Sequence, residues 1–191
     1  MTKILIAGMG NVLRRDDGFG VEVARRLARR WAGTGALGAG TGALPLHIVD
    51  THGQVKVIEV GIGGVHLVQE LMDGYDMLLV IDAVERGSAP GTTHVLEAQV
   101  SDLSDWPDDA RQDFLADMHY TTPSKALILA KALGVLPPKV FIVGCQPADA
   151  ADLGIGLSET VERAIGATMR EIEKIVGIWE DQLRTEAQTD A

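Results

Sequence analysis

Residues 76–84, Asp-Met-Leu-Leu-Val-Ile-Asp-Ala-Val, contain an unbroken apolar run that ends at Asp82. A continuous run, as opposed to an alternating one, is typical of a strand whose two faces are both covered by helices. Shorter strands are predicted at 3–7, 54–60 and 140–144, where branched apolar residues are bounded by glycine. The run at 76–84 therefore predicts the centre of a layered α/β domain.

Helices are predicted between and after these strands. Apolar residues at helical spacing predict helices over 18–31, 65–72, 123–133 and from Ser158 to Val176. The turn signal Pro90-Gly91 precedes a strand at 92–97, which we expect to pair antiparallel with the strand before it. The fold class predicted is α/β: a three-layer α/β/α sandwich around a mostly parallel, mixed five-stranded sheet with one antiparallel strand.

The length predicts one domain. A chain of 191 residues, 46% of them hydrophobic, can bury one core and is short for two unrelated domains. We expect a single domain over 1–183, with a glycine- and alanine-rich insertion near 33–44. Residues 184–191 are polar and are expected to form a flexible tail.

Charge and cysteine content narrow the class of partner and the compartment. A formal net charge of -10 argues against nucleic acid, which is bound through basic surfaces, and the arginines between Arg14 and Arg30 predict a solvated helix face. Cys145 is the only cysteine, so an internal disulfide and a multi-cysteine zinc site are both excluded. The apolar run at 4–7 is too short for a signal peptide or a membrane span. We expect a cytoplasmic protein without a membrane partner.

The loop after the first strand raises a nucleotide-binding alternative. Gly8-Met9-Gly10-Asn11 begins like a dinucleotide-binding loop, but Leu13 stands where the third glycine is needed. Asp16 and Asp17 follow at the point where a pyrophosphate would meet a helix N-terminus, and their charges would repel it. A nucleotide site is therefore disfavoured.

Three acidic side chains, Asp16, Asp17 and Asp82, are candidates for chemical roles, and each has a structural alternative. Asp16-Asp17-Gly18 suits the capping of a helix, although one aspartate suffices for that. The glycines Gly18 and Gly20 would let another chain or a ligand approach the backbone closely. Asp82 ends a buried strand, where α/β proteins bind ligands, but it could also cap a turn.

His119 lies in a polar loop before a helix, where it could be a metal ligand, a general base or simply a surface residue. Cys145, at the end of an apolar strand, is expected to be a small buried residue and not an activated thiol. The sequence has neither a Gly-x-Ser-x-Gly elbow nor a His-Glu-x-x-His helix. Spacing alone therefore identifies no standard protease.

Taken together, the motifs resemble those of the hydrogenase maturation endopeptidases. The resemblance is carried, in order, by Gly8-Met9-Gly10-Asn11, Asp16-Asp17-Gly18-Phe19-Gly20, Glu59-Val60-Gly61-Ile62-Gly63-Gly64, Val80-Ile81-Asp82-Ala83, His119, residues 138–144 and Gly154-Ile155-Gly156-Leu157-Ser158. It spans nearly the whole chain outside 33–52 and the tail. The family often has threonine where Ile62 stands, and the stretch before the second strand resembles an insertion.

The resemblance implies an endopeptidase that removes the C-terminal extension of a nickel-loaded hydrogenase large-subunit precursor. The family's metal-binding positions fall on Asp17, Asp82 and His119, which are therefore expected to be both the metal ligands and the catalytic residues. Asp16, one residue from the motif position, is the alternative to Asp17. The nickel is expected to arrive with the substrate, and another divalent ion such as cadmium or zinc is expected to fit the same ligands in vitro. Two carboxylates and an imidazole suit such a borderline ion.

Two other functions remain open from the residues alone. The same three side chains could dock the nickel-loaded precursor without cutting it, as a chaperone would. They could also hold a resident zinc ion in a hydrolase of another kind. Cleavage that depends on nickel in the precursor would distinguish the endopeptidase from both the chaperone and the zinc hydrolase.

Overall fold

The computed structural model describes residues 2–32, 46–49, 53–116 and 122–189. The expected insertion at 33–44 lies outside the described residues. The strands are β1 (Thr2–Met9), β2 (Leu46–Val49), β3 (Gly53–Gly61), β4 (Met77–Ala83), β5 (Thr93–Glu97) and β6 (Lys139–Cys145). The helices are α1 (Phe19–Ala32), α2 (Gly64–Leu71), α3 (Asp108–Ala116), α4 (Pro123–Ala132) and α5 (Glu159–Thr189), with short 3-10 turns η1 (Arg15–Gly18) and η2 (Leu103–Asp105).

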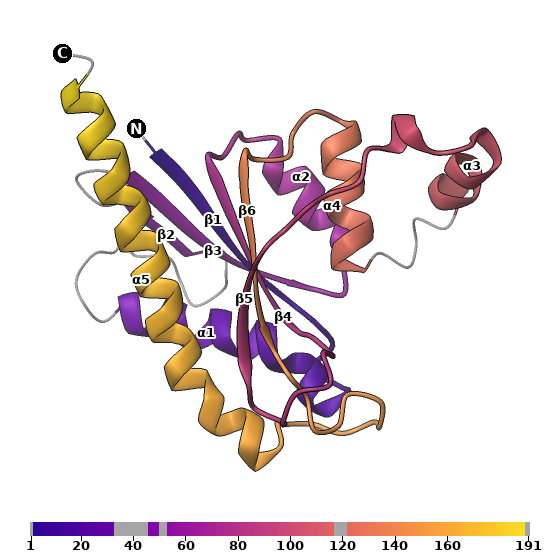
Figure 1. Cartoon of the computed structure of the whole chain (residues 1–191). Helices are drawn as coiled ribbons and strands as arrows, with labels where there is room; N and C mark the ends of the chain where they lie inside the picture. The colour runs from indigo at the N-terminus through magenta and orange to yellow at the C-terminus, as the bar shows by residue number, and fades with distance from the viewer. Residues whose placement is uncertain (1, 33–45, 50–52, 117–121, 190–191) are drawn as a thin grey trace.

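The sheet has the order β2-β3-β1-β4-β6-β5. Its four inner strands, β3, β1, β4 and β6, run parallel, and the two edge strands pair antiparallel with their neighbours. Helices α1 and α5 lie on one face, and α2 and α4 lie on the other (Figure 1). The predicted three-layer sandwich around a mostly parallel, mixed sheet is confirmed.

Two details of the predicted sheet need correction. The sheet has six strands in the described residues, because β2 adds an antiparallel edge to β3. Strand β5 pairs with β6 and not with β4, its predecessor in the chain. The reason is that β1 and β6 occupy both edges of β4 in parallel register, which leaves β5 only the outer edge of β6.

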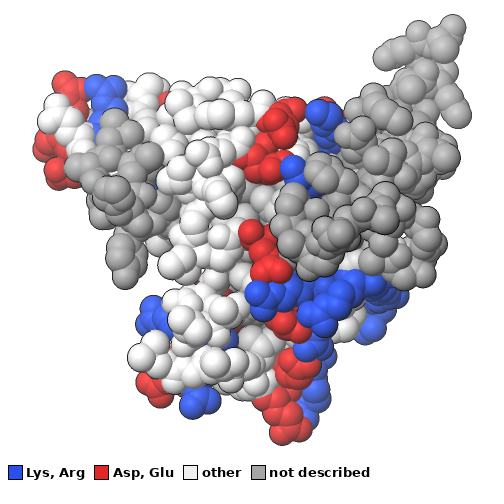
Figure 2. Space-filling model, turned by 180° about the vertical axis from the view of Figure 1, so that it is seen from behind, with Lys and Arg blue, Asp and Glu red and all other residues white. Residues whose placement is uncertain are grey.

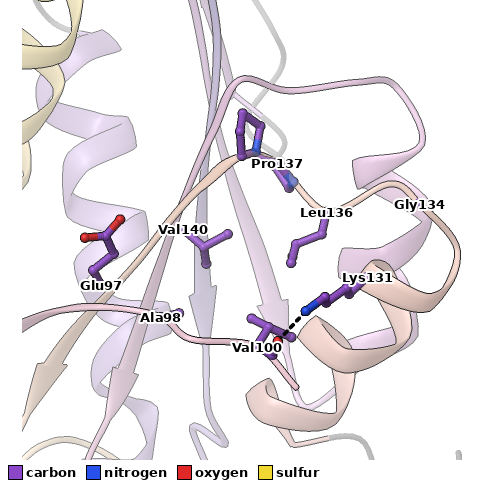
Figure 3. Close-up of a pocket in the computed structure, with 9 residues that line it drawn as sticks. Glu97, Ala98, Val100, Lys131, Gly134, Leu136, Pro137 and Val140 are labelled. Carbon is purple, nitrogen blue, oxygen red and sulfur yellow. Dashed lines mark hydrogen bonds between the residues drawn. The ribbon is translucent and has the colours of Figure 1, made fainter. Parts of the chain in front are cut away.

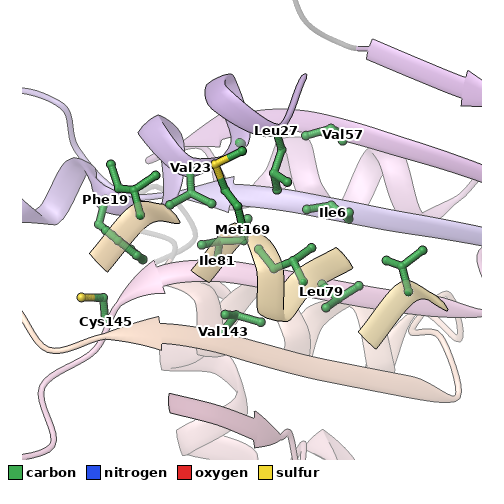
Figure 4. Packing of buried hydrophobic residues seen from close by; sticks show 14 of the residues in the cluster. Ile6, Phe19, Val23, Leu27, Val57, Leu79, Ile81, Val143, Cys145 and Met169 are labelled. Atoms are coloured by element: carbon green, nitrogen blue, oxygen red, sulfur yellow. The ribbon is translucent and has the colours of Figure 1, made fainter. Parts of the chain in front are cut away.

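The unbroken apolar run of β4 supplies both cores. Met77, Leu79 and Ile81 pack in the cluster beneath α1 and α5, which also contains Phe19, Leu27 and Met169 (Figure 4). The alternate residues Leu78 and Val80 pack in the cluster beneath α2 and α4. Each of these five β4 side chains is fully buried. Full burial stabilises the fold by about 1.5–3 kcal/mol for each side chain of this size.

The start of α4 agrees with the signals in the sequence. Thr122 is the N-cap of α4, where its side chain accepts a hydrogen bond from the Lys125 backbone N–H (3.4 Å), and Pro123 is in the first turn. Helix α5 runs to Thr189, through most of the stretch expected to be a tail.

In the part of the chain that the structure describes, no helix has both the length and the apolar character needed to cross a membrane.

Candidate active site

The loops that follow the inner strands line one cavity. It has a volume of about 620 Å³ and opens at the carboxyl ends of β1, β3 and β4. Its walls come from the loops after these strands, from the start of α4 and from the loop after β6; the lining residues are Met9, Gly10, Asn11, Arg14, Asp17, Gly61, Ile62, Asp82, Thr122, Pro123, Ala151 and Leu153. This edge is where open α/β sheets bind their ligands.

Asp82 is placed in this cavity by the end of β4. Its side chain is half-buried, and the strand pairs it with Gly144 of β6. Burial, followed by the negative charge of Asp17, raises the pKa of Asp82 from 3.8 to about 7, against the opposing hydrogen bond from the Ala83 backbone. The Asp82 carboxyl group therefore holds a proton more tightly than an ordinary aspartate does.

Asp17 reaches the same cavity from η1. Its carboxylate accepts a hydrogen bond from the Asn11 backbone N–H (2.9 Å), which ties η1 to the loop after β1. Gly10 makes this fold possible, because it has a φ of 116° and a Cβ there would lie 1.8 Å from the Asp17 carbonyl oxygen. Gly10 and Asp17, which belong to separate sequence motifs, therefore form one local structure.

The lack of a side chain at Gly20 lets α1 approach the sheet of this chain closely, and not another chain or a ligand. A Cβ on Gly20 would lie 2.0 Å from the Ile81 carbonyl oxygen and 2.4 Å from that of Met9. The close neighbours are therefore strands β4 and β1 of this chain. The sequence-based expectation for Gly20 was wrong, because the start of α1 packs directly against the sheet.

Asp16 and Asp17 lie in different environments. The Asp16 side chain is fully buried, and it accepts hydrogen bonds from the backbone N–H groups of Ala148 (2.9 Å), Asp149 (3.0 Å) and Ser158 (2.6 Å) and from the Ser158 hydroxyl (2.9 Å). Burial would raise the pKa of Asp16, but these hydrogen bonds, led by that of Ser158, together lower it. Asp16 thus holds the loop after β6, and Asp17 is the one that lines the cavity.

His119, the third expected ligand, lies outside the described residues. Thr122 and Pro123, which follow it in the chain, do line the cavity. Among the residues that the structure describes, no three His, Cys, Asp or Glu side chains are grouped closely enough to hold a metal ion. Asp17 and Asp82 therefore form the described part of the expected ligand set.

Other side chains considered from the sequence lie elsewhere. Cys145 is fully buried, as expected, and burial, helped by the charge of Asp16, raises its pKa to about 11, so the thiol is not activated. Glu59, from the glycine-rich motif, forms an ion pair with Arg25 (2.8 Å) and does not line the cavity. Sequence reasoning missed Arg14, Ala151 and Leu153 as lining residues, because nothing in the sequence places the loop after β6 against the loop after β1.

Three arginines of α1, namely Arg25, Arg26 and Arg30, are paired with carboxylates. Arg26 contacts Glu22 and Glu162 (2.7 Å each), and Arg30 contacts Glu173 (3.3 Å). On the face shown in Figure 2, basic side chains form a band that is bordered by acidic ones. The predicted solvated helix face therefore describes these arginines better than a site for phosphate does.

A second cavity, of about 300 Å³, lies at the opposite end of the strands, where β6 begins (Figure 3). Pro137 and Pro138, just before β6, line it together with Glu97 at the end of the antiparallel β5. Its lysine, Lys131, donates a hydrogen bond to the Val100 carbonyl oxygen (2.7 Å). This cavity is thus separated from Asp82 by the length of the strands.

Comparisons with known proteins agree with each other. The family model described as hydrogenase maturation protease matches residues 22–175. A hydrogenase expression/formation protein, HupD of Rhizobium leguminosarum bv. viciae, is 27% identical over 181 residues, which cover 93% of this chain and 75% of that protein.

Solved structures extend the similarity to the fold. The hydrogenase 2 maturation peptidase from a Thaumarchaeota archaeon has a TM-score of 0.58 and 27% identity, over 92% of this chain and 99% of that one. The hydrogenase maturating endopeptidase HybD from E. coli has a TM-score of 0.60 over 90% of each chain, and at 23% identity it supports the fold alone.

Proposed function

Because this chain belongs to the hydrogenase maturation protease family, and is therefore a peptidase, we propose that it removes the C-terminal extension of a nickel-loaded hydrogenase large-subunit precursor. Family membership gives the processing role. The proposal adds that nickel, carried by the precursor, is the recognition element. It also adds that Asp17, Asp82 and His119 bind this nickel.

The observation that supports the proposal most is the meeting of Asp17 and Asp82 in one cavity. The two carboxylates come from separate motifs, and the charge of Asp17 raises the pKa of Asp82. Two neighbouring carboxylates repel each other unless a proton or a cation lies between them. A divalent ion that arrives with the substrate can replace that proton, so nickel in the precursor strengthens binding.

His119 is proposed as the third ligand. Three peptide units separate it from Thr122, which lines the cavity, so the chain limits the distance between their Cα atoms to about 11 Å. Oxygen and imidazole ligands together suit a borderline divalent ion such as nickel. A cadmium or zinc ion would fit the same ligand set in vitro, where no precursor is present.

Coordination of the substrate's nickel would position the peptide bond for cleavage. Holding two reacting groups in a fixed geometry removes much of the entropic part of the barrier. A metal ion can activate a water molecule or polarise a carbonyl group, and either role would supply the chemistry of cleavage here. Without nickel the precursor would bind weakly, so cleavage would wait until the metal is inserted.

We place this step in the cytoplasm, because a chain with Cys145 as its one cysteine needs no oxidising compartment.

Substitution of the proposed ligands tests this assignment. Asp17→Asn, Asp82→Asn and His119→Ala are expected to lose cleavage of the nickel-loaded precursor while the far-ultraviolet circular dichroism stays unchanged. Asp113→Asn, on the exposed face of α3 and away from the cavity, is the matched control and should cleave normally. Normal processing by any one of the three variants would remove that residue from the proposed role.

A further inference from the structure

Large apolar side chains are exposed on the loops that form the active-site cavity, and two of them, Ile62 and Leu153, line it. Ile62, Leu153 and Ile155 are 71%, 82% and 89% exposed, more than any other large apolar side chain whose burial the structure describes, and Leu13 is 57% exposed. They lie on the loops that follow β1, β3 and β6, and we call the four together the apolar rim. Clustered exposed apolar side chains are typical of a surface that binds a partner.

The rim is continuous with the proposed site. Ile62 and Leu153 line the same cavity as Asp17 and Asp82. Leu13 belongs to the loop that pairs with the loop carrying Leu153, because the Gly154 N–H donates a hydrogen bond to the Leu13 carbonyl oxygen (2.9 Å). A partner seated on the rim would therefore also reach the two carboxylates.

The loop after β6 is held firmly, so the exposure of its side chains is built into the fold. Arg14 pairs with Gly154 in a parallel bridge, and the Arg15 N–H donates to the Gly154 carbonyl oxygen (2.9 Å). The Arg15 side chain forms an ion pair with Asp149 (3.2 Å), and the Asp16 carboxylate binds the start and the end of the loop. A preorganised surface binds with a smaller entropy cost than one that must first become ordered.

We propose that the apolar rim binds apolar side chains of the large-subunit precursor next to the segment that enters the cavity. This inference rests on the proposed function, since it takes the precursor as the occupant. Ile62 and Leu153 contact the segment that enters the cavity. Leu13 and Ile155 lie on the adjoining loops, where Ile155 lines a neighbouring cavity of about 280 Å³, and they extend the contact beyond the opening. A second copy of this chain is the less suitable occupant, because on the rim it would close the cavity against any substrate.

The test compares two double variants of the full chain. Ile62→Ser/Leu153→Ser removes the part of the rim that lines the cavity. Met72→Ser/Leu133→Ser is the matched control, because those side chains are 60% and 53% exposed and line none of the cavity. The binding of both to the host's nickel-loaded large-subunit precursor is measured by biolayer interferometry, and the KM and kcat of processing by mass spectrometry.

The rim variant is expected to raise Kd and KM by about tenfold or more, as loss of apolar contacts does, and to keep kcat at saturating precursor. The control should match the wild type in all three. Equal Kd values for rim variant and control would overturn the inference, as would loss of a wild-type dimer, seen by light scattering, with no change in Kd. Failure of the wild type to cleave would instead refute the proposed function, while Kd still tests the rim.

Discussion

Asp82→Asn is expected to stabilise the metal-free fold at neutral pH while it abolishes processing. Raising the pKa from 3.8 to about 7 is a shift of about three units, and each unit corresponds to about 1.4 kcal/mol. The upper limit is therefore about 4 kcal/mol. Because Asp82 is only half-buried and borders the cavity, we expect solvent to halve this to about 2 kcal/mol.

The pH window follows from the direction of the shift. Below about pH 4 the Asp82 carboxyl group is protonated in both the folded and the unfolded state, so it does not lower the free energy of unfolding. Between about pH 4 and 7 the unfolded chain ionises first, so the wild type loses stability as the pH rises; above about pH 7 the loss is complete. Asparagine does not titrate, so the advantage of Asp82→Asn should grow across this window and then stay constant.

Urea denaturation with a chelator present measures this difference at about pH 4 and about pH 8, with Asp113→Asn as the control. The free energy of unfolding of Asp82→Asn relative to the wild type should rise by about 2 kcal/mol between the two pH values. The control should show no such rise. Stability curves for the wild type and Asp82→Asn that stay parallel across the window would refute the reasoning.

Three substitutions and one control, Gly177→Ala, test how the site is built. Asp16→Asn should destabilise the fold by about 2–4 kcal/mol in urea denaturation, because a buried carboxylate loses part of its hydrogen-bonding capacity. Since the pKa of Asp16 is lowered, the wild type should lose this stability as the pH falls through that pKa, and a pH-independent difference would contradict the assignment. Gly20→Ala should destabilise by about 2 kcal/mol or more, whereas Gly177→Ala, in open space on α5, should stabilise by about 0.5–1 kcal/mol; equal thermal shifts would contradict the packing at Gly20. Asp17→Asn should lower the pKa of Asp82, measured by carbon NMR titration, and an unchanged pKa would show that the two charges do not interact.

Strand β4 shows how much of the fold the sequence could predict. An unbroken apolar run implies two covered faces, and in parallel sheets the residue after such a run lies at the ligand-binding edge. The layers and the place of Asp82 therefore followed from local pattern alone. The pairing of β5 did not, because a turn signal at Pro90-Gly91 reverses the chain without choosing its partner. Strand β2 was missed since a segment of four residues carries too little pattern to detect.

The roles of the two adjacent aspartates could not be separated in the same way. Their directions depend on Arg15, the one non-glycine residue of the described chain with a positive φ (45°). They also depend on the loop after β6, whose backbone N–H groups bind Asp16. Contacts between segments so distant in sequence have no local signature, and the same applies to Leu153 in the cavity wall.

The mass of the host's large-subunit precursor, followed after mixing with this protein, tests the central claim most directly. The precursor is prepared in nickel-loaded and nickel-free forms, with the nickel content verified in each. We predict the loss of a C-terminal peptide from the loaded form alone. An unchanged mass of the loaded precursor would contradict the claim in favour of a docking chaperone, and cleavage of both forms would contradict it in favour of a hydrolase with its own metal.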